Sequence, residues 1–280
     1  MYPLRVLCRV MEVSVSGYYK WLKRKPSKRE MEDNRLEINI KAAHQRGRGT
    51  YGTLRIKDEL AGEGIEAGRD RIRRLRKKLG LTSKNKKKYK ATTDSNHKMP
   101  VAANLLGQKF EASEPNKIWV SDITYVATDE GWLYVAAVKD LYNREVVGYA
   151  MSERMTQELI GRALIRAVKT RKPAPGMILH SDRGSQYCSN NYRYILNQFG
   201  MIQSMSRKGN CYDNAPIESF WGTLKVELIY QRRFETRSQA IREITEYIEI
   251  FYNRQRRHSS LGNISPAAFL QNYYRMKKAA

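Results

Sequence analysis

The chain has 280 residues, which is enough for a catalytic domain and one or two smaller modules. It contains 52 Lys and Arg against 28 Asp and Glu, a net charge of +24, and the surplus is concentrated in residues 1–100. This pattern is typical of a protein that binds a polyanion, although a merely soluble basic protein would share it. The three cysteines form no CxxC pair, the four histidines have no zinc-ligand spacing, and no apolar run reaches the roughly 18 residues of a membrane span. We therefore expect a soluble cytoplasmic protein with no membrane partner.

The first part of the chain is predicted to be helical and to carry most of the DNA-binding charge. Residues 1–46 are expected to form an N-terminal helical segment, because apolar residues recur there at helical spacing. Residues 47–81 are expected to form a helix-turn-helix-like module. Residues 82–116 follow as a basic linker that is able to lie along phosphates. The linker residues predicted to contact DNA are Lys86, Lys87 and Lys88.

The second helix of the predicted helix-turn-helix covers residues 69–79. Its apolar residues Ile72, Leu75 and Leu79 form one stripe, which leaves the basic residues on the other faces. A helix-turn-helix places such a second helix against DNA, whereas a solvated basic face is the alternative. The residues predicted to contact DNA here are Arg69, Arg71, Arg73, Arg74, Arg76, Lys77 and Lys78.

Residues 117–232 are predicted to form an α/β catalytic core, followed by a C-terminal helix and tail over residues 233–280. The order of elements, βββαβαβα, matches the ribonuclease-H-like fold, a mixed five-stranded sheet with flanking helices. Here that core is preceded by small all-α helix-turn-helix modules. The predicted strands cover residues 117–127, 132–141, 144–151, 177–180 and 201–205.

Three acidic residues within this core are candidates for a catalytic site. Asp122 lies in the first strand, Asp182 ends the stretch MILHSD that contains the fourth, and Glu218 lies on a helix in which Pro216 suits the first turn. Gaps of 59 and 35 residues separate the three acids. Two strand aspartates and one helical glutamate are what a two-metal phosphoryl-transfer site needs. Taken singly, each acid has a plainer explanation, as a turn former or as part of a solvated helix face.

This spacing resembles the D-D-35-E signature of DDE transposases and retroviral integrases. Lys225 follows Glu218 by seven residues, about two helical turns, and so lies on the same helix face. From about residue 45 to 275 the chain is also similar to the second-frame transposase of the bacterial insertion-sequence family conventionally numbered three. The matching stretches are TYGTLRI, PNKIWVSDITYV, LHSDRGSQY, SRKGNCYDNAPIESFWGTLKVEL and YNRQRRHSSLGNISPAAF.

The resemblance implies that the first and fourth strands are adjacent, which would bring Asp122 and Asp182 together. It implies two Mg²⁺ ions, about 3.5–4 Å apart, held by Asp122, Asp182 and Glu218, with Mn²⁺ as a substitute. It implies cleavage of DNA at insertion-sequence ends and transfer of the freed 3′-OH, through a figure-of-eight and a circle, to a new site. The implied partners are double-stranded DNA of the element ends and target, further copies of the chain on that DNA, and the first-frame protein or its frameshift fusion.

Further side chains near the carboxylates are predicted to contact DNA. Lys225 is expected to reach a phosphate as a point charge. His180 shares the strand parity of Asp182, and it is expected to bond a carboxylate or the DNA, or else to be a buried core histidine. The loop 206–212 is basic and contains Gly209. The other predicted contacts, each with a solvated surface as the alternative, are Arg207, Lys208, Asn210, Arg256 and Arg257.

Two other functions are compatible with parts of this pattern. A structure-selective nuclease of the same fold is one, although such nucleases prefer an acidic fourth ligand and lack the 35-residue gap followed by Lys. A non-catalytic DNA-binding regulator derived from a transposase is the other. The presence of all three acids, Asp122, Asp182 and Glu218, argues against the regulator.

Overall fold

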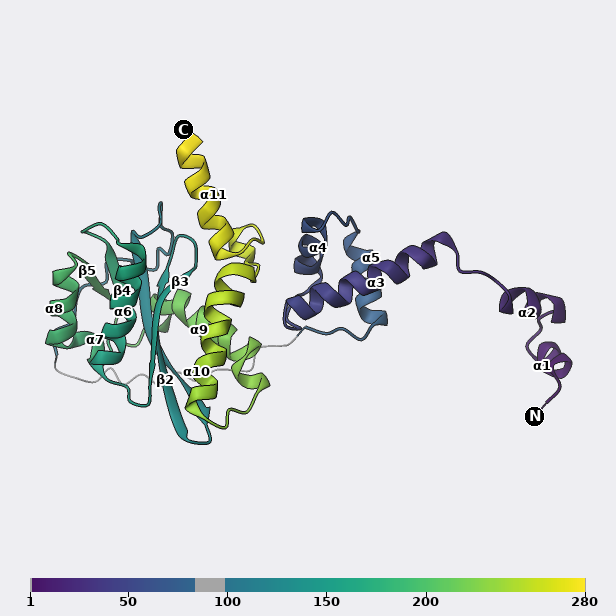
Figure 1. The fold of residues 1–280 in the computed structure, drawn as a ribbon, viewed down its shortest axis with the longest axis horizontal. Helices are drawn as coiled ribbons and strands as arrows, with labels where there is room; N and C mark the ends of the chain where they lie inside the picture. The colour runs from purple at the N-terminus through teal and green to yellow at the C-terminus, as the bar shows by residue number, and fades with distance from the viewer. Residues whose placement is uncertain (1, 84–98, 280) are drawn as a thin grey trace. The chain divides into compact units, whose positions relative to one another are not determined.

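The structure, a computed structural model, describes residues 2–83 and 99–279 of the chain. The chain divides into two compact units, Met1–Ser83 and Lys84–Ala280, and each is described by itself (Figure 1). The linker residues predicted to contact DNA, Lys86, Lys87 and Lys88, lie outside the described residues.

The N-terminal unit is helical, as predicted. Its helices over residues 2–83 are α1 (Leu4–Val10), α2 (Val15–Leu22), α3 (Lys28–Arg46), α4 (Thr53–Gly62) and α5 (Arg69–Lys78). A capping box starts α3, because the Ser27 hydroxyl accepts a hydrogen bond from the Glu30 backbone N–H and the Glu30 carboxylate accepts one from the Ser27 N–H. Of the residues in α1 and α2, only Cys8 is buried.

A single apolar cluster joins α3, α4 and α5. The buried residues of this cluster are Leu36, Ile40, Ala43, Tyr51, Ile56, Leu60, Ile72 and Leu75. The helix-turn-helix-like pair α4–α5 is therefore completed by α3, which supplies the first three of these residues. The boundary expected between residues 46 and 47 falls inside this cluster. Helical periodicity shows that α3 has an apolar face but not which helices cover it.

The second unit is built on a mixed five-stranded sheet (Figure 1). The strands are β1 (Ile118–Thr128), β2 (Gly131–Asp140), β3 (Val146–Ser152), β4 (Ile178–Ser181) and β5 (Ile202–Met205). Their spatial order is β3-β2-β1-β4-β5, with β1, β2 and β3 antiparallel and β1, β4 and β5 parallel. The predicted α/β fold class is confirmed, and β1 lies next to β4 as the resemblance implies.

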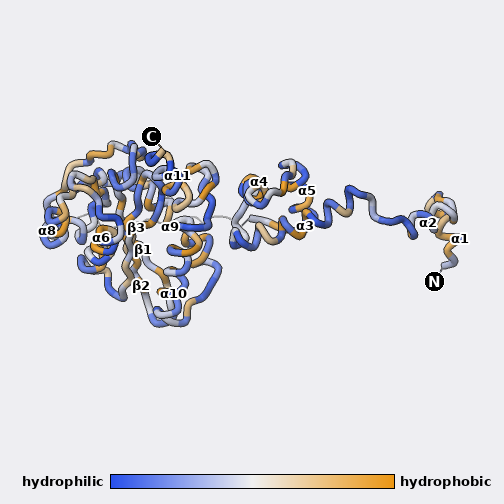
Figure 2. The backbone as a smooth tube through the Cα atoms, turned by 45° about the horizontal axis from the view of Figure 1, so that its top comes forward, coloured by the Kyte–Doolittle hydropathy of each residue, from blue (hydrophilic) through white to orange (hydrophobic). Residues whose placement is uncertain are grey.

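Helices cover both faces of this sheet. On one face lie α6 (Gln157–Arg171), α7 (Ser185–Cys188) and α8 (Asn190–Gln198), and on the other α9 (Ala215–Glu227) and α10 (Arg237–Glu246). Successive residues of β1 serve opposite faces, because Trp119 belongs to the cluster under α6–α8 and Val120 to the cluster under α9–α10. Apolar stretches occur in both the strands and the covering helices (Figure 2). The sheet is thus buried on both sides, which holds β1 and β4 rigidly.

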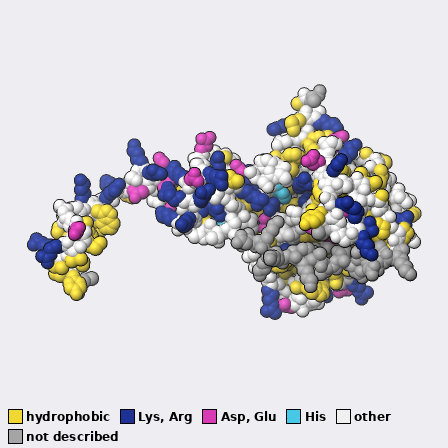
Figure 3. Space-filling model, turned by 180° about the vertical axis from the view of Figure 1, so that it is seen from behind, with side chains coloured by type: hydrophobic (Ala, Val, Ile, Leu, Met, Phe, Trp, Pro, Cys, Tyr) yellow, Lys and Arg dark blue, Asp and Glu magenta, His cyan; other side chains and the backbone are white. Residues whose placement is uncertain are grey.

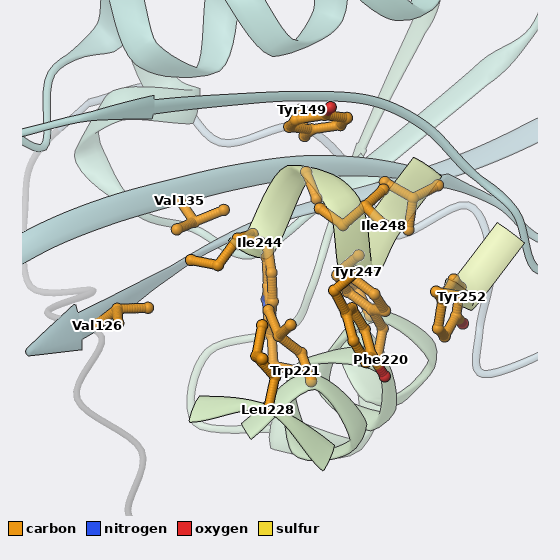
Figure 4. Close-up of a cluster of buried hydrophobic side chains, with 14 of the residues drawn as sticks. Val126, Val135, Tyr149, Phe220, Trp221, Leu228, Ile244, Tyr247, Ile248 and Tyr252 are labelled. Carbon is orange, nitrogen blue, oxygen red and sulfur yellow. The ribbon is translucent and has the colours of Figure 1, made fainter. Parts of the chain in front are cut away.

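The chain after residue 232 belongs to this core. Helix α10 continues into a π-helical segment, Tyr247–Gln255, where the sequence predicts one long helix over residues 236–254. The cluster shared by α9, α10 and this segment includes Phe220, Trp221, Ile244, Tyr247 and Ile248 (Figure 4). Short 3-10 turns lie at Cys211–Asn214, Ile229–Gln231 and Ser259–Leu261, and the final helix is α11 (Pro266–Ala279). The boundary expected at residues 232 and 233 therefore falls inside the packed core.

Candidate active site

Two of the predicted acids lie side by side at one end of the central strand pair. Strands β1 and β4 run parallel, and their last paired residues are Ser121 and Ser181. Asp122 follows Ser121 and Asp182 follows Ser181, so both acids lie at the same end of the parallel strand pair. Beyond this point β1 continues to Thr128 and stays paired with β2. On its other side β1 has no pairing with β4 after Ser121. The candidate site opens at that edge.

Glu218 reaches this edge from α9. A short 3-10 turn, Cys211–Asn214, leads into the helix, and Pro216 occupies its first turn, where a missing N–H costs nothing. The face of α9 that packs against the sheet carries Ile217, Phe220, Trp221 and Leu224, all buried. Glu218 is only partly buried, and the carboxylate lies off this apolar face.

Electrostatic interactions link the three carboxylates. Burial raises the pKa of Asp122 well above its ordinary value, and the negative charges of Asp182 and Glu218 raise this pKa further. Burial also raises the pKa of Glu218, and the charge of Asp182 adds to the effect. Asp122 and Glu218 thus resist ionisation beside the neighbouring acids, and a bound divalent cation would remove that resistance.

The chemistry of these donors fits a hard divalent cation. Asp122, Asp182 and Glu218 offer only carboxylate oxygens, which are the ligands that Mg²⁺ prefers. Within residues 2–83 and 99–279, however, no group of three or more His, Cys, Asp or Glu side chains is already arranged to hold a metal ion. The fold therefore brings the three acids within electrostatic reach of one another, while their oxygens do not yet converge on one point.

A pocket of about 600 Å³ opens beside the two aspartates. Asp122 and Asp182 belong to its lining, together with the aromatic residues Tyr125, Trp132 and Tyr134. The rings of Tyr125 and Trp132 pack edge to face with their centroids 4.9 Å apart. The sequence predicted none of these aromatic residues as part of the site, because strand alternation alone does not show which ones surround a cavity.

Lys225 approaches the same region from α9. Its ammonium lies over the Tyr125 ring, 5.1 Å from the ring centroid, and the residue is only 6% exposed. Burial lowers the pKa of Lys225, whereas the charge of Asp122 raises it. Lys225 therefore lies beside the carboxylates, as its position two turns after Glu218 suggests, but mostly inside the protein. Its predicted contact with a DNA phosphate stays a prediction.

Asp213 organises the loop that precedes α9. Its buried carboxylate accepts hydrogen bonds from the Arg207 guanidinium at 2.9 and 3.0 Å and from the Arg207 backbone N–H at 2.8 Å. It also accepts hydrogen bonds from the side chains of Asn104 and Gln108, at 2.8 and 2.9 Å. These donors, Arg207 first, hold the pKa of Asp213 well below its usual range. One carboxylate thus joins the loop, α9 and the segment that leads into the core.

The predicted DNA contacts in this loop have different environments. The Arg207 side chain is 56% exposed, although Asp213 holds its guanidinium. Lys208 is exposed and available to a partner. The Asn210 side chain accepts a hydrogen bond from the Tyr212 backbone N–H at 3.1 Å and so caps the turn before α9. The loop therefore offers Lys208 most directly to DNA.

Two residues predicted to contact DNA are buried instead. His180 is fully buried, and its Nδ1 and Nε2 atoms lie 2.8 and 3.3 Å from the hydroxyls of Ser204 and Ser206. Of the alternatives that the sequence left open, the structure favours the core histidine. Arg256 is 6% exposed and forms an ion pair with the buried Glu227, with N–O distances of 2.8–3.0 Å. A contact between either side chain and DNA does not fit these positions, because both polar groups are already hydrogen-bonded inside the core.

Arg257 lies next to this ion pair in the chain but has another environment. Its guanidinium donates a hydrogen bond to the Asn263 carbonyl at 2.9 Å, and the residue is partly exposed. Adjacent arginines in one basic segment therefore have opposite surroundings. The order of charged residues in the sequence does not show which of these two arginines is buried.

The basic residues of α5 separate into two stripes. Three of them form ion pairs with acids of α3: Arg71 and Arg74 with Asp33 at 2.7 and 2.6 Å, and Lys78 with Glu37 at 2.6 Å. Arg76, also on α5, donates hydrogen bonds through its guanidinium to the hydroxyls of Thr53, the first residue of α4, and of Ser83, which follows α5.

The second stripe of α5 forms no ion pair with α3 among the described residues. It contains Arg69, Arg73 and Lys77, all exposed and four residues apart, so they follow one line along the helix. Arg73 has one exposed neighbour, Asp70, at 3.5 Å, and no ion pair engages Arg69 or Lys77 among the described residues. Lys and Arg side chains are prominent on the surface of the N-terminal unit (Figure 3). This outer stripe is the part of the predicted DNA-binding face whose positive charges are not paired with acids of α3.

Lys139 was not predicted to have a role at the site. It lies fully within the core on β2, and its ammonium donates a hydrogen bond to the carbonyl of Pro216, 2.9 Å away, in the first turn of α9. Burial lowers the pKa of Lys139 to about 7, and the charges of Arg144 and Arg256 add to the effect. A lysine inside the apolar strand WLYVAAVKD is the one signal in the sequence, and it does not indicate which carbonyl the ammonium meets.

Comparison with protein families agrees with this architecture. Residues 31–89 match an HTH-like domain, and residues 112–211 and 200–266 match two models of the integrase core domain. These domains imply that DNA is the partner. In the part of the chain that the structure describes, no helix combines the length and the apolar character needed to cross a bilayer.

Individual relatives match nearly the whole chain. The chain is 60% identical over 270 residues, 96% of this chain and 99% of the relative, to the uncharacterized 31 kDa protein of insertion element IS600 from Shigella sonnei. It is 42% identical, over 96% of this chain and 94% of the relative, to the transposase InsF for insertion sequence IS3A from Escherichia coli K12. Among solved structures, the catalytic core domain of BIV integrase is similar, with a TM-score of 0.44, 16% identity and coverage of 58% of this chain and 99% of that one. The chain therefore belongs to the IS3 family of DNA transposases.

Proposed function

We propose that Asp122, Asp182 and Glu218 form a DDE active site that cleaves DNA strands at insertion-sequence ends and joins the freed 3′-OH to another strand. The observation that carries this proposal is the behaviour of Asp122, whose pKa is raised by burial and then by the charges of both other acids. Acids on two adjacent strands and on one helix are expected to interact in this way only if they face a common space.

The proposed cofactor is Mg²⁺, two ions for each site, with Mn²⁺ as a substitute because it prefers the same oxygen ligands. Asp122, Asp182 and Glu218 would hold them. When bound, such ions activate the water or 3′-OH that attacks the phosphate and stabilise the oxygen that leaves. The raised pKa of Asp122 and of Glu218 supports this assignment, because acids that resist ionisation alone become ionised beside a cation.

The chain's own residues would orient the reactants. Trp221 holds one oxygen of Asp122 through its indole N–H, which fixes the plane of that carboxylate. Lys225, above the Tyr125 ring, supplies a positive charge for a phosphate close to Asp122. Lys208 and the outer stripe of α5 would hold the flanking DNA through its phosphates. Joining one element end to the other would give a figure-of-eight and then a circle for reinsertion.

The test compares Glu218→Gln with the wild type on a labelled duplex that carries the inverted repeat flanking this gene. With Mg²⁺ the wild type should give cleaved and joined strands. E218Q should bind the same duplex with unchanged affinity and lose both products, because an amide is a poor ligand for the cation. Glu235→Gln is the matched control, since Glu235 is an exposed glutamate away from the site. Cleavage by E218Q at the wild-type rate would exclude the assignment, and cut products without joined ones would favour a nuclease.

The proposed partners follow from the same reaction. Two element ends must be brought together for joining, so we expect several copies of the chain on one DNA complex. The first-frame protein or its frameshift fusion is the other proposed partner. Because the substrate is bacterial DNA, we expect the protein in the cytoplasm with the nucleoid. Light scattering of the protein with one and with two DNA ends would show whether copies assemble only on paired ends.

A further inference from the structure

The pocket beside the two aspartates has an aromatic wall that strand cleavage by itself does not require. Tyr125 of β1 and Trp132 and Tyr134 of β2 line it. Trp132 is 50% exposed, although its ring is held edge to face against Tyr125 at a centroid distance of 4.9 Å. A ring that is held by a neighbour and still open to a cavity is a stacking platform for another π-system.

The lining selects a base rather than a phosphate. Among the described residues that line the pocket there is no lysine or arginine to pair with a phosphate inside it. The lining also contains Gln186, whose amide lies 3.4 Å from the Met155 carbonyl and 3.5 Å from the Ser185 hydroxyl. Both distances are long for hydrogen bonds, so the amide can exchange these partners for the edge of a base.

The size of the pocket limits its occupant to a single nucleotide. A volume of about 600 Å³ is that of a small-molecule site. A nucleotide of a DNA end reaches this space only when its base is turned out of the stack.

We propose that the pocket receives an unpaired base of the DNA end, turned out of the helix next to the phosphate that is cleaved. Trp132 stacks on the face of this base and Gln186 contacts its edge. The inference rests on the proposed function, since the cations that the carboxylates would hold decide which phosphate, and so which nucleotide, lies beside the pocket. Binding the base there would hold the adjoining phosphate against Asp122 and Asp182.

The experiment measures equilibrium binding of the end duplex, by fluorescence anisotropy, with three states of each nucleotide beside the scissile phosphate: paired, mismatched and abasic. The wild type should bind the mismatched end more tightly than the paired end, because a mismatched base costs less to turn out. Trp132→Ala should weaken binding of the mismatched end by about 5- to 160-fold, which corresponds to the loss of one stacked base. The same substitution should have no effect on the abasic end, which has no base to stack.

Matched variants separate this effect from a general loss of structure. Trp132→Phe keeps a ring and should keep most of the preference for the mismatched end, and Gln186→Ala should reduce it without touching the aromatic wall. Tyr194→Ala removes an aromatic side chain that is 62% exposed on α8, outside the pocket lining, and should change nothing.

Two outcomes overturn the inference: equal weakening of the abasic and mismatched ends by W132A, or no weakening of either. Cleavage of the wild-type complex with Mg²⁺ is read separately. If the wild type cleaves and W132A binds every end as tightly as the wild type does, the proposed reaction stands and the pocket assignment fails. If W132A loses affinity for the mismatched end alone and the wild type does not cleave with Mg²⁺, the pocket assignment stands and the proposed reaction fails.

Discussion

The indole N–H of Trp221 donates a hydrogen bond to Oδ2 of Asp122 at 3.1 Å and so joins α9 to β1 at the candidate active site. The bond lowers the pKa of Asp122 and thus opposes the effect of burial. Trp221 lies on the same helix as Glu218 and is buried in the cluster that packs this helix on the sheet. One side chain therefore influences both the ionisation of one acid and the position of another.

Replacing this donor should shift the pH dependence of the reaction. Trp221→Phe removes the N–H, so the pKa of Asp122 should rise further and the acid should ionise only at higher pH. A hydrogen bond to a charged group is worth about 1.5–3 kcal/mol, so the acidic limb of the pH profile of end cleavage should move up by about one unit or more. Trp119→Phe is the control, because the Trp119 indole makes the same type of bond, 3.2 Å long, to Asp140 elsewhere in the sheet. An equal shift in both variants would contradict the prediction.

The two stripes of α5 should have different roles. Changing Arg69, Arg73 and Lys77 together to Gln should weaken DNA binding and reduce the slope of log affinity against log salt by up to about 0.9 for each phosphate that is no longer neutralised. Changing Arg71, Arg74 and Lys78, the residues paired with α3, to Gln removes the same charge but breaks these ion pairs. This second variant should lose thermal stability and keep most of the salt slope. If both variants reduced the salt slope equally, the ion pairs with α3 would not keep Arg71, Arg74 and Lys78 from binding DNA phosphates.

The buried His180 should make the core sensitive to acid. Burial lowers its pKa to about 4 in the folded protein, against an ordinary value of 6.5. Between these pH values the unfolded chain binds a proton that the folded chain does not, so the free energy of unfolding falls as the pH falls. By pH 4 the loss is about 3 kcal/mol. Urea unfolding at a series of pH values should show a flatter decline for His180→Asn, and an equally steep decline would contradict the assignment.

The buried ion pair between Arg256 and Glu227 should contribute to folding and not to DNA binding. Arg256→Gln leaves the Glu227 carboxylate buried without its charged partner, which should cost about 3–5 kcal/mol of unfolding free energy. The Tyr247 hydroxyl, which donates to the same carboxylate at 2.7 Å, would still provide that carboxylate with one hydrogen bond. Arg257→Gln, in the partly exposed neighbour, should leave stability nearly unchanged. Denaturant unfolding measures both, and equal losses would show that burial does not distinguish the two arginines.

Periodicity and spacing in the sequence predicted most of the local structure. The strands of the core alternate along the chain with turn residues between them, and their predicted ends lie within two residues of the observed ones. The acids could be selected because Asp122, Asp182 and Glu218 stand at a strand, a strand end and a helix start with a distinctive 35-residue gap. The strand and helix signals are local, since each depends on residues a few positions apart, whereas the 35-residue gap identifies the acids only through its resemblance to the D-D-35-E signature.

The sequence by itself determined the type of each element, the surplus of positive charge and the candidate acids. Only the tertiary structure decided which basic residues face solvent, because a charge in the chain carries no information about the acid that folding brings next to it. Arg256 meets Glu227 across 29 positions, and Arg71 meets Asp33 across 38. The same holds for Trp221 and Asp122, which are 99 residues apart and adjacent only because α9 packs on β1.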